Sequence, residues 1–168
     1  SDVAAGRQPF DLADGVLREE CRVAAGKAIA CILNCQLVVE GKKTAWAQQY
    51  DQESLQSVVA RVSELPSIAV PESAEILRFL MHIDSPSTEV VLAVQGAVGW
   101  LDKVKVVESK VITVKDAGLP GGIDKRLVHA PGAPPIWGRY YEIGTDRVMY
   151  IEQGVVHYSL DALSHKHR

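Results

Sequence analysis

The hydrophobic pattern of the chain changes its period near Leu101, and this change limits the possible folds more than any other feature. Before Leu101, apolar residues recur every three or four positions, as in helices; after it, β-branched residues alternate with lysines, as in strands. We therefore expect a mainly α fold with a β-rich C-terminal part, in the α+β class. The expected organisation is a single compact domain over 1–168, helical over 11–103 and β-rich over 104–168.

Individual elements follow from the same pattern and from local helix and turn signals. The apolar spacing and the prolines predict helices over four segments: 11–36, 54–62, 71–82 and 86–101. Residues 37–44 are predicted to be extended, with a turn at Gly41. Residues 139–143 and 148–151 are predicted to pair as a hairpin.

The overall charge and the cysteines exclude some classes of partner and site. The formal net charge is −3 and the pI is about 5.9, which gives no general attraction to nucleic acid or to an anionic membrane. No apolar run approaches the roughly 18 residues that a membrane span requires. We therefore predict neither a nucleic-acid partner nor a membrane partner. Cys21, Cys31 and Cys35 form no CxxC pair, so we predict free, buried thiols rather than a zinc site.

Four strings concentrate polar, aromatic and cationic residues between the apolar elements. They are GKKTAWAQQYD at 41–51, ARVSELPS at 60–67, PES at 71–73, and WGRYYE with TDR at 137–147. In this order they resemble the pectate lyases of polysaccharide lyase family 10, whose segments read NGKxTxWxQQ, AR-x-x-E-x-PS, GES, WARFYE and TNR. The resemblance extends from about Cys21 to Tyr158.

The resemblance implies a fold and a reaction. The implied fold is part of an (α/α) toroid of helices with an attached β-rich lobe. The implied reaction is the β-elimination that cleaves α-1,4-linked polygalacturonate, with an arginine as Brønsted base, and the matching string places that arginine at Arg61. Arginine is normally protonated, so a base role implies an alkaline pH optimum. From the residues alone, Arg61 is also consistent with an exposed arginine paired with Glu64 or Asp51.

Further residues are candidates for binding an acidic sugar. Arg139 and Arg147 can bind uronate carboxylates through two parallel hydrogen bonds, or they can form ion pairs with Glu142 or Asp146. Trp46 and Tyr140 can pack against sugar rings, with Gln49 nearby as a polar contact. A tryptophan in such a segment also suits the protein core.

The chain departs from the family in three ways that bear on function. It resembles only the downstream half of the family's catalytic domain. The upstream Phe-Asn-Asp-type motif that supplies calcium ligands is not found in it, so calcium is implied by the resemblance without a matching motif. An arginine expected after the hairpin, in a DRDG string, is replaced near Glu152-Gln153-Gly154. A calcium ion or the arginines Arg139 and Arg147 would then neutralise the uronate.

Several functions are compatible with these observations. The expected activity is a pectate lyase acting on polygalacturonate or low-methylated pectin, and since that polymer lies outside cells, the resemblance implies a secreted protein. The alternative is a non-catalytic galacturonan-binding or scaffold domain derived from such a lyase. A glycoside hydrolase would need a pair of carboxylates, for which the candidates are Asp51, Glu64, Glu72 and Glu142.

Overall fold

The computed structural model describes residues 2–119 and 121–164, and the chain divides into two compact units, Ser1–Cys35 and Gln36–Arg168. The first unit contains α1 (Asp2–Ala5) and α2 (Gly15–Asn34). The Asp14 carboxylate accepts the Leu17 amide at 2.8 Å and caps α2, so the helix predicted over 11–36 is confirmed with its start at this cap. No helix of the described residues is both long enough and apolar enough to cross a membrane.

The three cysteines, two in α2 and Cys35 directly after it, were predicted to be free and buried. The first part of this prediction is confirmed and the second is wrong. All three thiols are free. Cys31 is exposed, however, while Cys21 and Cys35 are partly buried. Burial is the largest cause of a raised pKa at the Cys35 thiol, and the neighbouring Cys31 raises it further.

The second unit begins with a short hairpin of β1 (Val38–Val39) and β2 (Lys42–Lys43). Glu40 and Gly41 form its turn with positive φ angles of 49° and 75°, as a two-residue hairpin requires. The predicted turn at Gly41 is confirmed. The buried side-chain amide of Gln36 donates to the carbonyls of Thr44 and Ala93 at 2.9 and 2.8 Å. These bonds join the hairpin to the helix that contains Ala93, α4 (Thr88–Val104).

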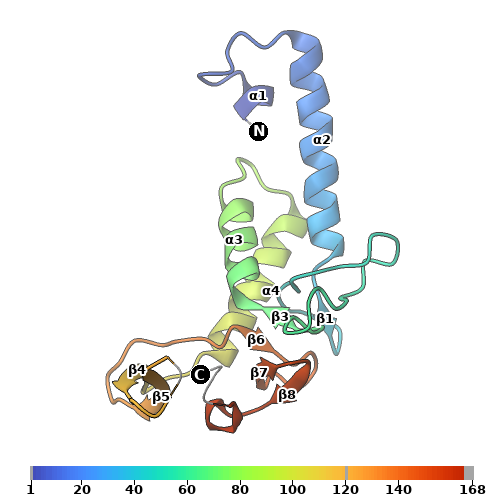
Figure 1. The fold of residues 1–168 in the computed structure, drawn as a ribbon. Coiled ribbons are helices and arrows are strands. Elements are labelled where there is room, and N and C mark those ends of the chain that lie inside the picture. The colour runs from blue at the N-terminus through green and yellow to red at the C-terminus, as the bar shows by residue number, and fades with distance from the viewer. Residues whose placement is uncertain (1, 120, 165–168) are drawn as a thin grey trace. The chain divides into compact units, whose positions relative to one another are not determined.

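Two helices, α3 (Val70–Met81) and α4 (Thr88–Val104), pack side by side in the second unit (Figure 1). Pro71 lies in the first turn of α3, and the Ser87 hydroxyl accepts the Val90 amide at the start of α4. Both predicted helices are confirmed, the second with its cap at Ser87. Their buried sides consist of Ser73, Leu77, Leu80, Val90, Ala93, Ala97, Trp100 and Val104.

A four-stranded antiparallel sheet forms the core of the second unit, in the order β3 (Ile68–Ala69), β6 (Tyr140–Tyr141), β7 (Val148–Glu152) and β8 (Val155–His157). The β6–β7 pair confirms the predicted hairpin. The Tyr141 ring meets Trp100 edge to face at 5.2 Å, and its hydroxyl donates to the Val104 carbonyl at 3.0 Å. These contacts join the sheet to α4.

A second hairpin, β4 (Ser109–Lys115) paired with β5 (Ile123–His129), forms a separate two-stranded ribbon (Figure 1). The short helix η1 (Leu160–Ala162) contacts β5. The alternating valines and lysines after Leu101 therefore do form strands, as predicted.

The predicted fold class is wrong. The chain is 35% helical and 22% strand, so it is not mainly α, and strands occur already in the part expected to be helical. In the described part of the second unit, α3 and α4 form one helix pair, which does not make a toroid. Residues 54–62 are not helical, because the Asp51 carboxylate accepts the amides of Glu53 and Ser54 and holds a turn. The single compact domain over 1–168 stays a prediction.

Candidate functional site

The connection from β2 to β3, residues 44–67, begins with a buried stretch. The Ser73 hydroxyl of α3 accepts the Trp46 amide at 2.9 Å and donates to the Trp46 carbonyl at 3.1 Å. Trp46 is 0% exposed. Its ring belongs to the core and has no surface to offer a sugar, which corrects the expectation that Trp46 packs against the substrate.

Past this stretch the chain forms a groove of about 380 Å³, which we call the arginine groove. It is lined by Gln48, Gln49, Val58, Val59, Ala60, Arg61 and Glu64. Two backbone hydrogen bonds shape it: the Val58 amide donates to the Gln49 carbonyl at 3.1 Å, and the Ala60 amide donates to the Glu64 carbonyl at 3.0 Å. The structure thus brings together two of the predicted site residues, Gln49 and Arg61.

Arg61 reaches into solvent at the edge of the arginine groove. Its side chain is 79% exposed, while that of Glu64 is only 11% exposed. The Arg61 Nε lies 3.5 Å from Glu64 Oε2, so the ion pair considered from sequence is present. The contact is made by the Nε of Arg61, and the Glu64 carboxylate is the more deeply buried of the two partners.

A second arginine is linked to the groove through Tyr140. The Tyr140 hydroxyl donates to Gln48 Oε1 at 2.5 Å, and the Arg139 guanidinium lies 5.1 Å from the Tyr140 ring centre. Arg139 also contacts Glu72 Oε1 at 3.5 Å. A hydrogen bond with Tyr140, followed by the charges of Glu72 and Glu64, raises the pKa of Arg139, although burial opposes the rise. Tyr140 itself is buried, so it orients its neighbours and exposes little ring surface.

The turn between β7 and β8 lies beside the Arg61 segment. A methyl group added at Gly154 would come within 3.5 Å of Val62 Cγ2. Gln153 and Gly154 form this turn, with φ angles of 50° and 82°. The turn near which the resemblance expects an arginine therefore lies next to Val62, the residue that follows Arg61.

Arg147 has its own set of partners. Its guanidinium stacks on the Tyr158 ring at 3.5 Å. Tyr158 and Thr145 donate hydrogen bonds to the Glu142 carboxylate; these bonds and the charge of Arg147 lower the pKa of Glu142. The described contacts of Arg147 join the β6–β7 turn to Tyr158. None of them links Arg147 to the arginine groove.

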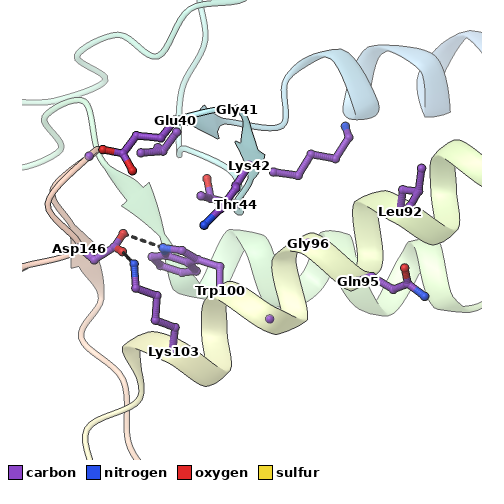
Figure 2. Close-up of a pocket in the computed structure, with 14 residues that line it drawn as sticks. Glu40, Gly41, Lys42, Thr44, Leu92, Gln95, Gly96, Trp100, Lys103 and Asp146 are labelled. Atoms are coloured by element: carbon purple, nitrogen blue, oxygen red, sulfur yellow. Dashed lines mark hydrogen bonds and ion pairs between the residues drawn. The ribbon is translucent and has the colours of Figure 1, made fainter.

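A larger cavity of about 710 Å³ lies between the β1–β2 hairpin, α4 and the β6–β7 turn (Figure 2). Asp146 accepts hydrogen bonds from Trp100 Nε1 at 2.8 Å and from Lys103 Nζ at 2.6 Å. Burial works to raise the pKa of Asp146, but these hydrogen bonds and the Lys103 charge outweigh it and lower the pKa. The polar groups at this end of the cavity are thus paired with one another.

Replacing the Asp146 carboxylate should cost stability in a pH-dependent way. Because its pKa is lower in the folded state, the carboxylate stabilises the fold above the unfolded pKa of about 4, and this contribution is lost as the pH falls through the folded value. We expect Asp146→Asn to lower the free energy of unfolding by about 1–2 kcal/mol at pH 7, with a smaller difference below about pH 4. Asparagine tolerates the φ of 57° at this position.

Urea unfolding of the wild type and the variant at several pH values would measure this difference. Asp102→Asn is the matched control, because Asp102 also pairs with a lysine but is 73% exposed. Equal losses in the two variants, or a loss that does not depend on pH, would contradict the role assigned to Asp146.

The described residues do not fit a metal site. Among them, no three His, Cys, Asp or Glu side chains gather closely enough to hold an ion. Calcium takes six to eight oxygen ligands. The acidic side chains near the arginine groove, Glu64 and Glu72, are instead paired with Arg61 and Arg139.

Sequence reasoning missed the roles of two residues in this arrangement. Glu72, rather than Glu142 or Asp146, is the acidic partner of Arg139. Gln48, rather than Gln49, links the groove to Tyr140. The doubled glutamine drew attention to this segment, but nothing local indicates which of the two faces Tyr140, and the Glu72–Arg139 pair joins residues far apart in the chain.

Comparisons with known proteins agree with one another. The sequence family described as pectic acid lyase matches residues 1–168. The structure of a variant of the family 10 polysaccharide lyase from Cellvibrio cellulosa, in complex with trigalacturonic acid, is 26% identical with a TM-score of 0.80. This match covers 98% of this chain and 51% of that one. A second structure of the Cellvibrio lyase matches with the same identity and TM-score, over 98% of this chain and 50% of that one. The chain thus spans about half the length of these lyases. Proteins of curated function gave no match.

Proposed function

Because the chain belongs to the pectic acid lyase family, we propose that it cleaves polygalacturonate by β-elimination with Arg61 as the Brønsted base. Arg61 takes the proton from C5 of the uronate. The electrons of that C–H bond form the C4–C5 double bond as the C4–O bond to the neighbouring sugar breaks. Arg61 acts in its neutral form. The leaving oxygen takes a proton from water, and the hydroxide left behind takes the C5 proton from Arg61, which becomes neutral again.

The arginine groove is the observation that carries this proposal. It presents Arg61 and Gln49 on one concave surface, and the Tyr140–Gln48 hydrogen bond connects it to Arg139. The exposed guanidinium group of Arg139 suits a polymer with a carboxylate on each sugar. Arg139 fits the role of carboxylate partner, because an arginine stays charged at the pH of the assay and its side chain is 56% exposed. A cation on the uronate carboxylate stabilises the charge that develops when the C5 proton leaves.

Arg147, Trp46 and Tyr140 have more limited parts in this proposal. Tyr140 positions Arg139 and Gln48. Arg147 would reach substrate only by leaving the Tyr158 ring, so we give it no part in binding. Trp46 supports the groove from the core.

The proposal routes no step through calcium, since the described residues do not gather a ligand set. The test is incubation of the chain with polygalacturonate at alkaline pH, with calcium and with EDTA, while the absorbance of the unsaturated uronate is followed. We expect product in both, because the arginines neutralise the carboxylate. Product that EDTA abolishes would assign that role to calcium, and the absence of product in both would reject the catalytic proposal.

A non-catalytic galacturonan-binding domain is the second candidate. The missing arginine favours it, because the turn in which that arginine is expected has Gly154 beside Val62, next to Arg61. It predicts binding of polygalacturonate without any unsaturated product. The same incubation, combined with a binding measurement, separates it from a lyase.

The expected location follows from the substrate. A galacturonan polymer lies outside the cell that degrades it, so we propose that the protein is secreted. Fractionation of cells that produce the natural protein, with an assay of the medium, would test this; protein that stays in the cytoplasm would contradict it.

A further inference from the structure

The β4–β5 ribbon has one face that no other described element covers. Cross-strand partners lie on the same side of a sheet, so the register assigns alternate pairs to each face. One face, which we call the ribbon face, comprises Ser109, Val111, Thr113, Lys115, Ile123, Lys125, Leu127 and His129. All of these except Ser109 are exposed. The opposite face carries Asp124, which is 2% exposed, and the partly buried Ile112 and Val114.

The charges differ between the two faces. The opposite face carries two cations, Lys110 and Arg126, and one acid, Asp124. Asp124 holds Arg126 with an Oδ2–Nε distance of 2.9 Å, so one of these two cations is neutralised. The ribbon face carries Lys115 and Lys125 and no acidic residue. Across the described residues, neither lysine has an acidic partner within 4.0 Å. This face is therefore positive in a chain whose net charge is −3.

The two lysines lie close enough to act on one ligand. Lys125 is opposite Thr113 and Lys115 is opposite Ile123, which makes the lysines diagonal neighbours roughly 7–8 Å apart at their backbone. The long lysine side chains can therefore bring both ammonium groups to one anion, which would offset their mutual repulsion. The Thr113 hydroxyl beside them offers a hydrogen-bond partner.

An apolar strip runs along the same face. Val111 and Leu127 are cross-strand partners that are 52% and 45% exposed, and Ile123 is also 45% exposed. Exposed apolar residues grouped in this way mark a contact surface. Together, the strip and the lysines suit a polymer that has apolar C–H faces and repeated carboxylates.

We infer that the ribbon face is a second binding site for the galacturonan chain, separate from the arginine groove, which holds the polymer through Lys115 and Lys125. The inference rests on the proposed substrate and on charge complementarity with it. A long chain would occupy both sites, whereas trigalacturonate would need only the groove. Holding the polymer at two places raises the effective concentration of its uronates near Arg61.

The test compares two double variants with the same change in net charge. Lys115→Gln/Lys125→Gln removes the cations of the ribbon face. Lys27→Gln/Lys110→Gln removes two exposed lysines outside that face, one in α2 and one on the opposite side of β4. Affinity electrophoresis in gels containing polygalacturonate measures the dissociation constant, and neutral, fully methylated pectin serves as the reference polymer. We expect the first variant to bind polygalacturonate about tenfold more weakly and the second to bind normally. Turnover of trigalacturonate should be unchanged in both.

Three outcomes would overturn the inference. These are normal binding by the ribbon variant, equal losses in both variants, and equal retention of the wild type by the neutral polymer. A further possibility is that the ribbon face binds a second copy of the chain, in which case Val111→Ser/Leu127→Ser would change the elution volume in size-exclusion chromatography and leave polymer binding intact. Another result is that the wild type forms no product while polymer binding is weakened only by the ribbon substitutions. In that case the proposed reaction fails and the ribbon site stands.

Discussion

Arg61→Ala should lower the rate of unsaturated product formation by roughly 10²–10⁴-fold, the range for loss of a general base. The side chain is 79% exposed, but its removal takes the ion pair from Glu64, which is only 11% exposed. We therefore expect the melting temperature to fall by no more than about 5 °C. Polymer binding should weaken far less than turnover, because Arg139 and the ribbon lysines remain. The rate, the dissociation constant and thermal unfolding would be measured on the same preparation.

Arg78→Ala provides the matched control for this substitution. Arg78 also pairs with a glutamate three residues away, at 3.3 Å and with 74% exposure, but on α3. Turnover in this variant should equal that of the wild type. Arg61→Lys adds a second comparison, since it keeps the charge but loses the planar guanidinium. Full activity in Arg61→Ala would exclude Arg61 as the base, and a large fall in its melting temperature would assign it a structural role instead.

Gly96→Val should lower the free energy of unfolding by about 3 kcal/mol, at the upper end of the range for overpacking. A Cβ atom at Gly96 would lie 2.7 Å from Lys43 Cβ and 3.0 Å from the Lys43 carbonyl oxygen. Lys43 cannot withdraw freely, because the Gln36 amide holds the neighbouring Thr44 carbonyl. The helix and the β1–β2 hairpin would have to separate. Chemical denaturation would measure the loss.

Gly99→Val makes the same substitution one turn further along α4. A Cβ atom there meets nothing within 4 Å, so only the helix propensity changes, by a few tenths of a kcal/mol in favour of valine. The two variants should therefore differ by about 3 kcal/mol although they share a helix and a side chain. Equal stabilities would show that the contact between Gly96 and Lys43 does not limit packing.

The elements that could be predicted from sequence are those fixed by local signals. Pro71 and Ser87 mark the starts of α3 and α4, and Gly144 lies in the turn of the β6–β7 hairpin. The strand β3 was missed, because two residues show no alternation and their partners in β6 lie far along the chain. The error over 54–62 has a similar cause, since the apolar spacing there is helical but the Asp51 side chain holds a turn.

The sequence predicted which residues form the site better than it predicted how they are arranged. The ordered strings led to Arg61, Gln49 and Arg139, which the structure gathers around one groove or links to it. Exposure was the property that sequence could not supply. Trp46 and Tyr140 are residue types that often bind sugars, yet both are buried. Arg147 stacks on the Tyr158 ring.

The paired hydrogen bonds between Ser73 and Trp46 have a consequence for motion. The Ser73 hydroxyl forms hydrogen bonds with both the amide and the carbonyl of Trp46. A side chain of α3 thus makes the bonds that a neighbouring strand would make in a sheet. The Ala69 amide also donates to the Trp46 carbonyl at 2.9 Å. Fraying of the first turn of α3 would therefore release the segment that leads into Gln48 and Gln49. We therefore expect the start of this helix and the wall of the arginine groove to open together, with matching amide hydrogen exchange.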